Sequence, residues 1–434
     1  MSQKILVQAD WLLKWGEGLE IIPRGEVEIA GGIISYSGPA RENKERDFTR
    51  VIRGKNRLIM PGLINTHTHA AMSLFRGYAD DMPLQEWLEK RIWPVEARLK
   101  KKDIYWGTLL AICEMIRGGT TCFADMYFYM GEAAKACLES GIRASLSQGL
   151  VGLDVIKGLA ALKEGKELVR DWHGEGEGRI TVMLGPHAPY TCPPGYLRKV
   201  AETAELLHVP IHIHLAETKK EIEESLKNEG KRPIELMEQI GLLRQDVLAA
   251  HCVHLTPGEI RILAENKTAV AHNPGSNLKL GSGVAPLADL MQNGVLVSLG
   301  TDSAASNNNL DMVEEMRLAT LLPKGLRGDP TIVPAVEAIR LATVNGAGAL
   351  FLKEKVGTLG EGSQADLIMI NLDQPHLHPL HSLPAQIVYS ALSSDVELVM
   401  VDGNILMEKG DLKTLDEEKI LFETAKISSR LVGQ

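Results

Sequence analysis

The sequence predicts an α/β fold, a TIM-like (β/α)₈ barrel with a small β-sandwich built from both chain termini. Short apolar runs alternate with amphipathic helical stretches through the middle of the chain, and eight such runs can be counted. Parallel strands buried on both faces appear as short apolar runs, and a helix normally connects one to the next. The polar residues best suited to chemistry follow the ends of these runs, as they do in barrel enzymes.

The eight apolar runs are the expected barrel strands. They cover residues 58–69, 120–126, 143–150, 180–188, 210–217, 247–255, 268–274 and 295–303. Between them, stretches such as 101–119 place apolar residues at helical spacing and end on glycine, as helices commonly do. The chain has 434 residues and is 44% hydrophobic, which is enough to bury a core of this size.

Both ends of the chain have the pattern of short strands. Chain termini often lie close together, so the two β segments are expected to pair. We therefore expect three parts: residues 1–58 as the N-terminal part of the sandwich, 59–350 as a metal-dependent barrel, and 351–434 as the C-terminal part of the sandwich with a closing helix.

The composition and charge of the chain limit the kinds of partner that it can bind. The net charge of −9 argues against a broad nucleic-acid surface, and no apolar run reaches the 18 residues of a membrane span. The N-terminus lacks the pattern of a signal peptide, and the five cysteines are scattered and odd in number. We therefore expect a cytoplasmic protein with reduced thiols that acts on a small molecule and binds neither nucleic acid nor membrane.

The stretch "NTHTH" places His67 and His69 two residues apart at the end of the first run. Side chains at i and i+2 of a strand point the same way, so both imidazoles can bind one metal ion. The fifth run ends with His214 and the eighth with Asp302. Three imidazoles and one carboxylate suit zinc, although iron(II) also accepts these ligand types. The predicted metal ligands are His67, His69, His214 and Asp302.

Longer motifs carry a family resemblance. The stretches "PGLINTHTHAAMSLFRGYADDMPLQEWLEKRIWPVEARL", "HLAET", "SNLKLGSG" and "GTDSAASNNNLDM" resemble those of the amidohydrolase superfamily, in its mononuclear deaminase branch, and most closely the 5-methylthioadenosine/S-adenosylhomocysteine deaminases. The resemblance covers nearly the whole chain. It implies hydrolytic deamination of an adenosine-type nucleoside and a homo-oligomer. Two-metal relatives carry a lysine at the end of the fourth strand, where this chain has "GPHAP", so one metal ion per subunit is expected.

Roles in catalysis follow from the resemblance and from the chemistry of the side chains. Glu217, three residues after His214, is expected to act as general acid and base toward the purine ring. Asp302 is expected to accept the proton of the attacking water, and His251 to hydrogen-bond that water. A carboxylate that only orients an imidazole is the alternative for Glu217, and a buried structural histidine is the alternative for His251.

Substrate contacts are implied by the resemblance alone. Glu96 is expected to bind the ribose hydroxyls, and His187 to contact the ribose or the purine. Trp87 is a candidate wall of the pocket. In family members the third strand can end "SRGL", with an arginine for the carboxylate of a homocysteine tail. Here Gln148 stands at that place in "SLSQGL" and is a candidate substrate contact. Its neutral amide weakens the case for S-adenosylhomocysteine and leaves methylthioadenosine, 5′-deoxyadenosine and adenosine as candidates.

Three other functions remain open from the sequence. A related aminohydrolase or chlorohydrolase acting on guanine, a pterin or an s-triazine would share the metal ligands. A two-metal amide or ring hydrolase would need a second ion. A binding protein without catalytic activity would be expected to have lost ligands, which this chain has kept. The sequence does not rank the possible 5′-substituents.

Overall fold

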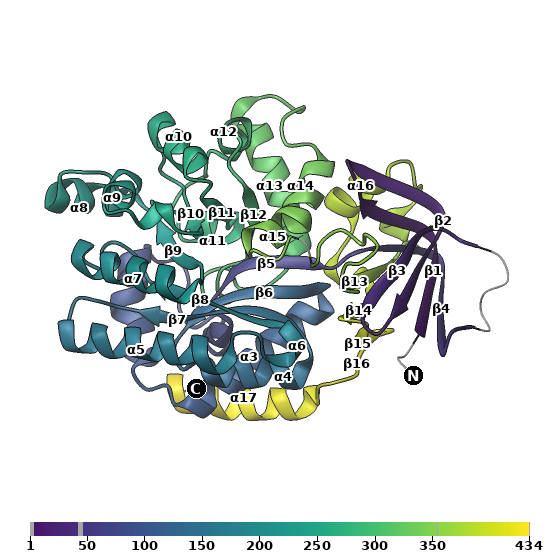
Figure 1. The fold of residues 1–434 in the computed structure, drawn as a ribbon, viewed down its shortest axis with the longest axis horizontal. Helices are drawn as coiled ribbons and strands as arrows, with labels where there is room; N and C mark the ends of the chain where they lie inside the picture. The colour runs from purple at the N-terminus through teal and green to yellow at the C-terminus, as the bar shows by residue number, and fades with distance from the viewer. Residues whose placement is uncertain (1–3, 42–46, 354, 434) are drawn as a thin grey trace.

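The centre of the molecule is a parallel barrel. The structure is a computed structural model that describes residues 4–41, 47–353 and 355–433. In it, eight parallel strands lie side by side in chain order (Figure 1). They are β5 (Leu63–Thr68), β6 (Thr120–Tyr127), β7 (Arg143–Leu150), β8 (Ile180–Pro186), β9 (Ile211–Leu215), β10 (Val247–His251), β11 (Ala269–His272) and β12 (Val297–Leu299). Each lies within or beside one of the eight predicted runs, which confirms the predicted barrel.

Hydrogen bonds join the first and last barrel strands. The Asp302 backbone N–H donates to the carbonyl of His67 at 2.9 Å, and Thr66 Oγ1 donates to the carbonyl of Leu299 at 2.8 Å. These bonds bring the end of β12 directly beside the end of β5. Two of the predicted metal ligands, His67 and Asp302, are therefore neighbours through the backbone although they are far apart in the chain.

Helices surround the barrel and connect its strands (Figure 1). They are α1 (Leu84–Trp87), α2 (Trp93–Glu96), α3 (Lys101–Arg117), α4 (Met130–Ser140), α5 (Val155–Trp172), α6 (Glu175–Gly178), α7 (Pro194–Leu207), α8 (Lys219–Glu229), α9 (Pro233–Gln239), α10 (Pro257–Glu265), α11 (Pro274–Lys279), α12 (Leu287–Gln292), α13 (Met312–Arg327), α14 (Ala335–Ala342), α15 (Val344–Ala349), α16 (Leu383–Ala385) and α17 (Glu417–Val432). Among the described residues, no helix is both long and apolar enough to span a membrane.

The strands of both termini form a second sheet beside the barrel (Figure 1). Its order is β16-β15-β14-β13-β4-β1-β2-β3, so β4 pairs with β13 across more than 300 residues of chain. The strands are β1 (Lys4–Trp15), β2 (Leu19–Ala30), β3 (Ile33–Pro39), β4 (Arg50–Pro61), β13 (Leu367–Asn371), β14 (Val396–Val401), β15 (Asn404–Glu408) and β16 (Asp411–Leu412). They form one continuous sheet, and a separate small core joins buried side chains of β1 and β2 to those of β13 and β14.

The predicted closing helix, α17, packs on α3 of the barrel. Arg430 of α17 lies 2.6 Å from Asp103 of α3. A buried ion pair makes a second connection between the C-terminal segment and the barrel. Arg143, at the start of β7, donates from Nε and Nη2 to both carboxylate oxygens of Asp366, at 2.7 and 3.0 Å, and both side chains are almost fully buried. Asp366 also accepts the backbone N–H of Asp402, so it holds β7 and the β14–β15 turn together.

Removal of Arg143 is expected to destabilise the whole molecule. Arg143→Ala would leave the Asp366 carboxylate buried without its partner, which costs roughly 3–5 kcal/mol. Urea denaturation followed by tryptophan fluorescence measures the loss. Arg117→Ala is the matched control, because the Arg117–Glu417 pair is exposed and such pairs contribute about 1 kcal/mol or less. Equal effects of the two changes would contradict a structural role for the buried pair.

Candidate active site

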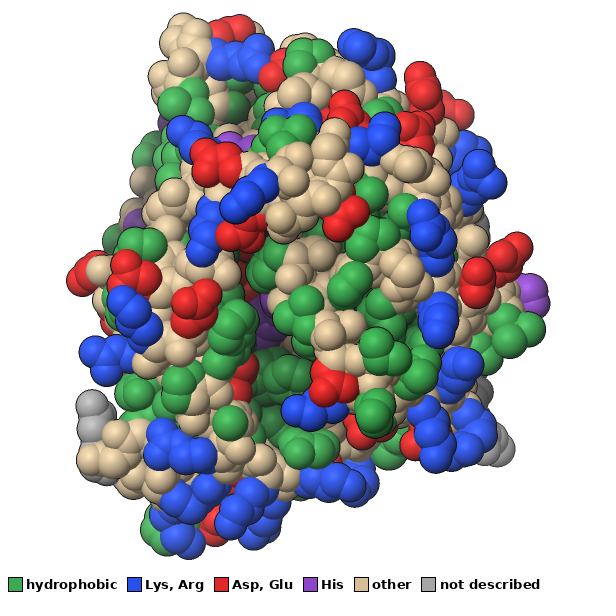
Figure 2. Space-filling view, turned by 90° about the vertical axis from the view of Figure 1, so that its left-hand side faces the viewer, with side chains coloured by type: hydrophobic (Ala, Val, Ile, Leu, Met, Phe, Trp, Pro, Cys, Tyr) green, Lys and Arg blue, Asp and Glu red, His purple; other side chains and the backbone are tan. Residues whose placement is uncertain are grey.

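The side chains predicted to bind metal, catalyse or contact substrate meet at the carboxyl ends of the barrel strands. A cavity of about 360 Å³ opens there, and Figure 2 shows it as a hollow with histidine visible at its base and hydrophobic side chains around it. The lining includes eight of the ten predicted site residues, and a ninth, His67, lies beneath it. The eight are His69, Trp87, Glu96, His187, His214, Glu217, His251 and Asp302.

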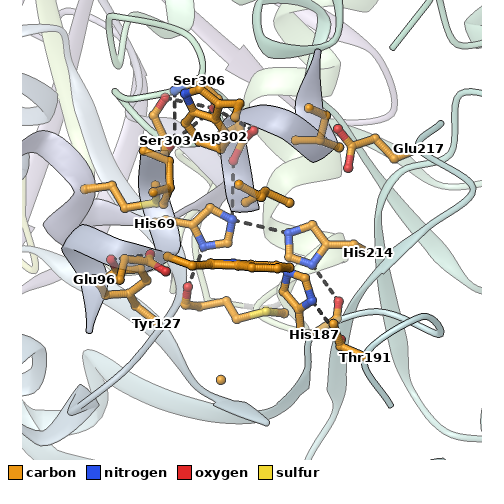
Figure 3. A pocket seen from close by; sticks show the side chains of 18 of the residues that line it. His69, Glu96, Tyr127, His187, Thr191, His214, Glu217, Asp302, Ser303 and Ser306 are labelled. Atoms are coloured by element: carbon orange, nitrogen blue, oxygen red, sulfur yellow. Dashed lines mark hydrogen bonds and ion pairs between the residues drawn. The ribbon is translucent and has the colours of Figure 1, made fainter. Parts of the chain in front are cut away.

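The four predicted metal ligands converge on one point. His69 Nε2 lies 3.2 Å from His214 Nε2 and 3.4 Å from Asp302 Oδ1 (Figure 3). His67 Nε2 lies 3.6 Å from the same oxygen. Two ligand atoms bound at ~2.1 Å to one tetrahedral ion are separated by about 3.4 Å. These three distances match that separation, and the ligand atoms of His67, His69 and Asp302 all lie within 4.8 Å of one another, with His214 next to His69.

The second nitrogen of each ring fixes which atom can bind a metal. His69 Nδ1 donates to the carbonyl of Met126 at 2.5 Å, and His214 Nδ1 donates to the carbonyl of His187 at 2.7 Å. In a neutral ring the proton on Nδ1 leaves Nε2 with a free lone pair. Two such lone pairs repel each other at 3.2 Å unless a cation lies between them. The buried Nε2 of His67 also has no hydrogen-bond partner, so the donor set fits a metal ion.

Burial keeps these rings neutral. It lowers the pKa of His67 and of His214 well below 6.5, and neighbouring imidazoles lower both further. Burial of Asp302 by itself would raise the pKa of that carboxyl, but His69, His251 and two serine hydroxyls lower it below its usual value. The imidazoles of His67 and His214 are therefore neutral and the Asp302 carboxylate is ionised, which are the forms that bind metals.

The backbone near the strand ends places the ligands. Asp302 has φ of 60° and lies one residue after Thr301, where the chain turns out of β12. Gly300 permits this close approach, because a Cβ at that position would lie 2.8 Å from the backbone nitrogen of His67. The other site residue with a positive φ is His251, at 72°. Left-handed conformations of ordinary residues cost energy and collect at functional sites.

Glu217 and His251 face each other beside the ligands. Glu217 Oε2 lies 3.9 Å from His251 Nε2, and Glu217 Oε1 accepts a hydrogen bond from Ser282 at 3.2 Å. Burial raises the pKa of the Glu217 carboxyl above its usual value. His251 Nδ1 donates to Asn277 Oδ1 at 2.8 Å, so its Nε2 is directed at Glu217. A buried carboxyl of raised pKa beside the ligand cluster is suited to proton transfer.

Glu96 reaches the cavity from α2 and is held by Tyr127. The phenol of Tyr127, at the end of β6, donates to Glu96 Oε1 at 2.6 Å (Figure 3). Burial raises the pKa of Tyr127 well above 10, so the phenol remains a donor. Trp87 lies in the wall of the cavity and donates from Nε1 to the carbonyl of Ala79 at 2.9 Å. The chain between β5 and α3 thus supplies one side of the cavity.

His187 lies next to His214, with 4.9 Å between ring centroids. Its Nδ1 lies 2.8 Å from Thr191 Oγ1, and burial lowers its pKa to about 4. His187 is therefore neutral at neutral pH, with Nε2 left for another partner.

The expectation for Gln148 is corrected by the structure. Its amide oxygen accepts the backbone N–H of Met130 at 3.3 Å, and its amide nitrogen donates to Glu164 at 3.1 Å. Met130 begins α4 and Glu164 lies on α5, so the side chain points toward the outer helices. Successive residues of a strand face opposite sides, and the neighbouring residue, Gly149, lines the cavity instead.

Several supporting residues were not found from the sequence. Ser276 and Ser306 donate to Asp302 Oδ2 at 2.5 and 2.7 Å, which leaves Oδ1 for the ligand cluster. His212 Nε2 lies 2.8 Å from His67 Nδ1 and orients that ring. Tyr127 directly follows the predicted run 120–126 and is the last residue of β6, and its position there does not indicate that it contacts Glu96. The serines lie in loops, where no periodic pattern identifies them.

Comparisons with known proteins agree with this geometry. The amidohydrolase family model matches residues 58–406. A 5-methylthioadenosine/S-adenosylhomocysteine deaminase of Moorella thermoacetica is 54% identical over 94% of this chain and 95% of its own length. Among solved structures, an adenosine deaminase from Xanthomonas campestris with bound zinc has a TM-score of 0.95 at 32% identity and covers 100% of this chain and 99% of its own.

A more distant solved structure shares the fold alone. Atrazine chlorohydrolase from Arthrobacter aurescens, complexed with zinc, has a TM-score of 0.90 at 24% identity, over 98% of this chain and 100% of its own. The match of the family model to most of the chain and the high identity to the Moorella relative together show the family of this protein. The chain belongs to the amidohydrolase family.

Proposed function

We propose that this protein catalyses zinc-dependent hydrolytic deamination of adenosine-type nucleosides, giving the inosine analogue and ammonia. The observation that carries the proposal is the convergence of three imidazole nitrogens and one carboxylate oxygen beside the buried Glu217, with the Glu96–Tyr127 pair across the same cavity. The names of the relatives, 5-methylthioadenosine/S-adenosylhomocysteine deaminase and adenosine deaminase, support the same reaction.

One zinc ion per subunit is proposed, held by His67, His69, His214 and Asp302; iron(II) is the alternative ion. When bound, zinc lowers the pKa of a coordinated water to about 7 and so makes hydroxide available at neutral pH. We further propose a cytoplasmic homo-oligomer acting on a small molecule. The described cysteines are all free and buried, which supports a reducing compartment.

The chain's own residues move the protons. Asp302 accepts a proton from the attacking water while Glu217 gives its proton to ring N1, as the water oxygen bonds to C6. His251, beside Glu217, hydrogen-bonds the new oxygen and steadies the tetrahedral carbon. Asp302 then passes its proton to the amine, which leaves as ammonia. The hydroxyl proton returns to Glu217 as the oxo group forms, so both carboxyls regain their starting forms.

Glu96 is proposed to bind the ribose. A carboxylate can accept hydrogen bonds from two adjacent hydroxyls, and Tyr127 holds this one in place. A free base or a triazine has no such diol, so this pair favours nucleosides over the substrates of the guanine deaminase and chlorohydrolase branches. His187 and Trp87 are proposed as further contacts to the substrate.

An ammonia-release assay over adenosine, 5′-substituted adenosines, adenine and guanine tests the function. We expect nucleosides to turn over and Glu217→Gln to lower kcat by about 10²–10⁴-fold, because the amide cannot transfer the proton. Metal content of the variant should stay unchanged, since Glu217 is not among the ligands. Free adenine, guanine or an s-triazine reacting as fast as nucleosides would contradict the proposal.

Metal analysis of the purified enzyme tests the site. We expect one equivalent of zinc per chain, loss of activity on chelation, and recovery on adding zinc. His67→Ala should lower the metal content, whereas His376→Ala should not, because His376 bonds Asp395 outside the cavity. Two equivalents of metal per chain would instead support a two-metal hydrolase.

Glu96→Gln tests the ribose contact. A hydrogen bond to a charged group is worth about 1.5–3 kcal/mol, so kcat/KM for nucleosides should fall by about 10- to 100-fold. Turnover of free adenine, where measurable, should change far less. Tyr127→Phe should also lower kcat/KM for nucleosides. The decrease that it causes should be smaller in the Glu96→Gln background, because the two residues act as a pair. Additive effects would show that Tyr127 does not act through Glu96.

A further inference from the structure

The outer part of the cavity differs sharply from its base. The base carries the histidines and the acidic residues, all buried or half-buried. The lining residues nearest to solvent are Trp93, Phe128, Val151 and Leu153, with exposed fractions of 39%, 37%, 37% and 66%. All four are apolar. We call these four residues the apolar rim.

The rim adjoins the proposed ribose contact. Trp93 lies one helical turn before Glu96, and Phe128 directly follows Tyr127. Val151 and Leu153 follow β7, and Gly149, near the end of β7, also lines the cavity. From the base outward, the cavity therefore runs from the ligand cluster, past the Glu96–Tyr127 pair, to the rim. A nucleoside with its purine at the base and its ribose at Glu96 points its 5′ carbon toward the rim.

The rim offers no oppositely charged partner to an ionic group. Among the described residues that line the cavity, none is lysine or arginine, and the acidic ones are Glu96, Glu217 and Asp302, which lie inside the rim. Figure 2 shows hydrophobic side chains gathered around the mouth of the hollow. A carboxylate or ammonium placed against this surface loses water without gaining an ion pair, whereas an alkyl or thioether group gains from burial.

We infer that the apolar rim selects an uncharged, apolar 5′-substituent, of the alkylthio class, over a zwitterionic amino-acid tail or a free hydroxyl. The inference rests on the proposed nucleoside deamination and specifies its substrate. Gln148 does not contribute, since it faces the outer helices. The selection comes instead from four apolar side chains on three segments of the chain: α2, the loop after β6 and the loop after β7.

A matched series of substrates tests the selection. The wild-type enzyme is assayed for ammonia release with adenosine, 5′-methylthioadenosine, 5′-propylthioadenosine and S-adenosylhomocysteine. The last two share the same carbon chain and differ in the ionic groups that it carries. The ratio of their kcat/KM values therefore measures the effect of those ionic groups alone. We expect kcat/KM for methylthioadenosine to exceed that for adenosine by about tenfold or more, and propylthioadenosine to exceed S-adenosylhomocysteine by about tenfold.

Two exposed leucine and isoleucine positions provide the variants. Leu153→Ser should reduce the ratio of kcat/KM for 5′-methylthioadenosine to kcat/KM for adenosine several-fold. Ile156→Ser is the control, because Ile156 is 81% exposed at the start of α5 but does not line the cavity, and it should leave the ratio as in the wild type. Both sites are at the surface, so folding should be preserved, and circular dichroism checks it.

The outcomes separate the inference from the proposed function. If every adenosine compound releases ammonia but S-adenosylhomocysteine equals or exceeds its propylthio match, the rim does not select against charge and the inference is overturned while the function stands. An unchanged ratio in Leu153→Ser overturns it as well. If no adenosine compound reacts and a free base or triazine does, the proposed function fails and the inference fails with it.

Discussion

The site depends on lone pairs that face one another. His69, His214 and His67 each use one ring nitrogen to bind a partner in the protein. Of their other nitrogens, that of His69 lies 3.2 Å from that of His214 and 3.4 Å from an oxygen of Asp302, and that of His67 lies 3.6 Å from the same oxygen. Such an arrangement is repulsive without a cation and strongly attractive with one. The remaining features of the barrel mouth, including the serines that hold Asp302, serve to keep these atoms aimed at the same point.

A parallel barrel suits this requirement because it delivers residues distant in sequence to one ring of strand ends. Here the proposed ligands lie in or directly after β5, β9 and β12, and the closure of β12 on β5 through the backbone of Asp302 and His67 sets the distance between those two residues. The terminal sheet lies on the opposite side of the barrel from the mouth (Figures 1 and 2), and the buried Arg143–Asp366 pair ties that sheet to the barrel. Stability and chemistry therefore depend on different ends of the strands.

Much of this could be predicted from the sequence because strands and ligands leave periodic signals. The eight runs located the barrel strands, and histidines two apart indicated ligands on one face of a strand. Gln148 shows the limit of such reasoning. A motif position locates a residue along the chain, but a strand alternates its faces, and one step decides between the cavity and the outer helices. Tyr127 shows the converse, since a tyrosine at a strand end gives no sign that it holds Glu96.

The division of the cavity into three zones explains how related proteins with one fold can act on different substrates. The ligand cluster lies on the barrel strands and is fixed by backbone geometry, so it can remain while other parts vary. Glu96, Trp87 and Trp93 come from the segment between β5 and α3, and Leu153 comes from the loop after β7. Loops tolerate substitution better than barrel strands. Choice of substrate can therefore change by exchanging side chains on these two segments, while the residues proposed to activate water and transfer protons stay in place.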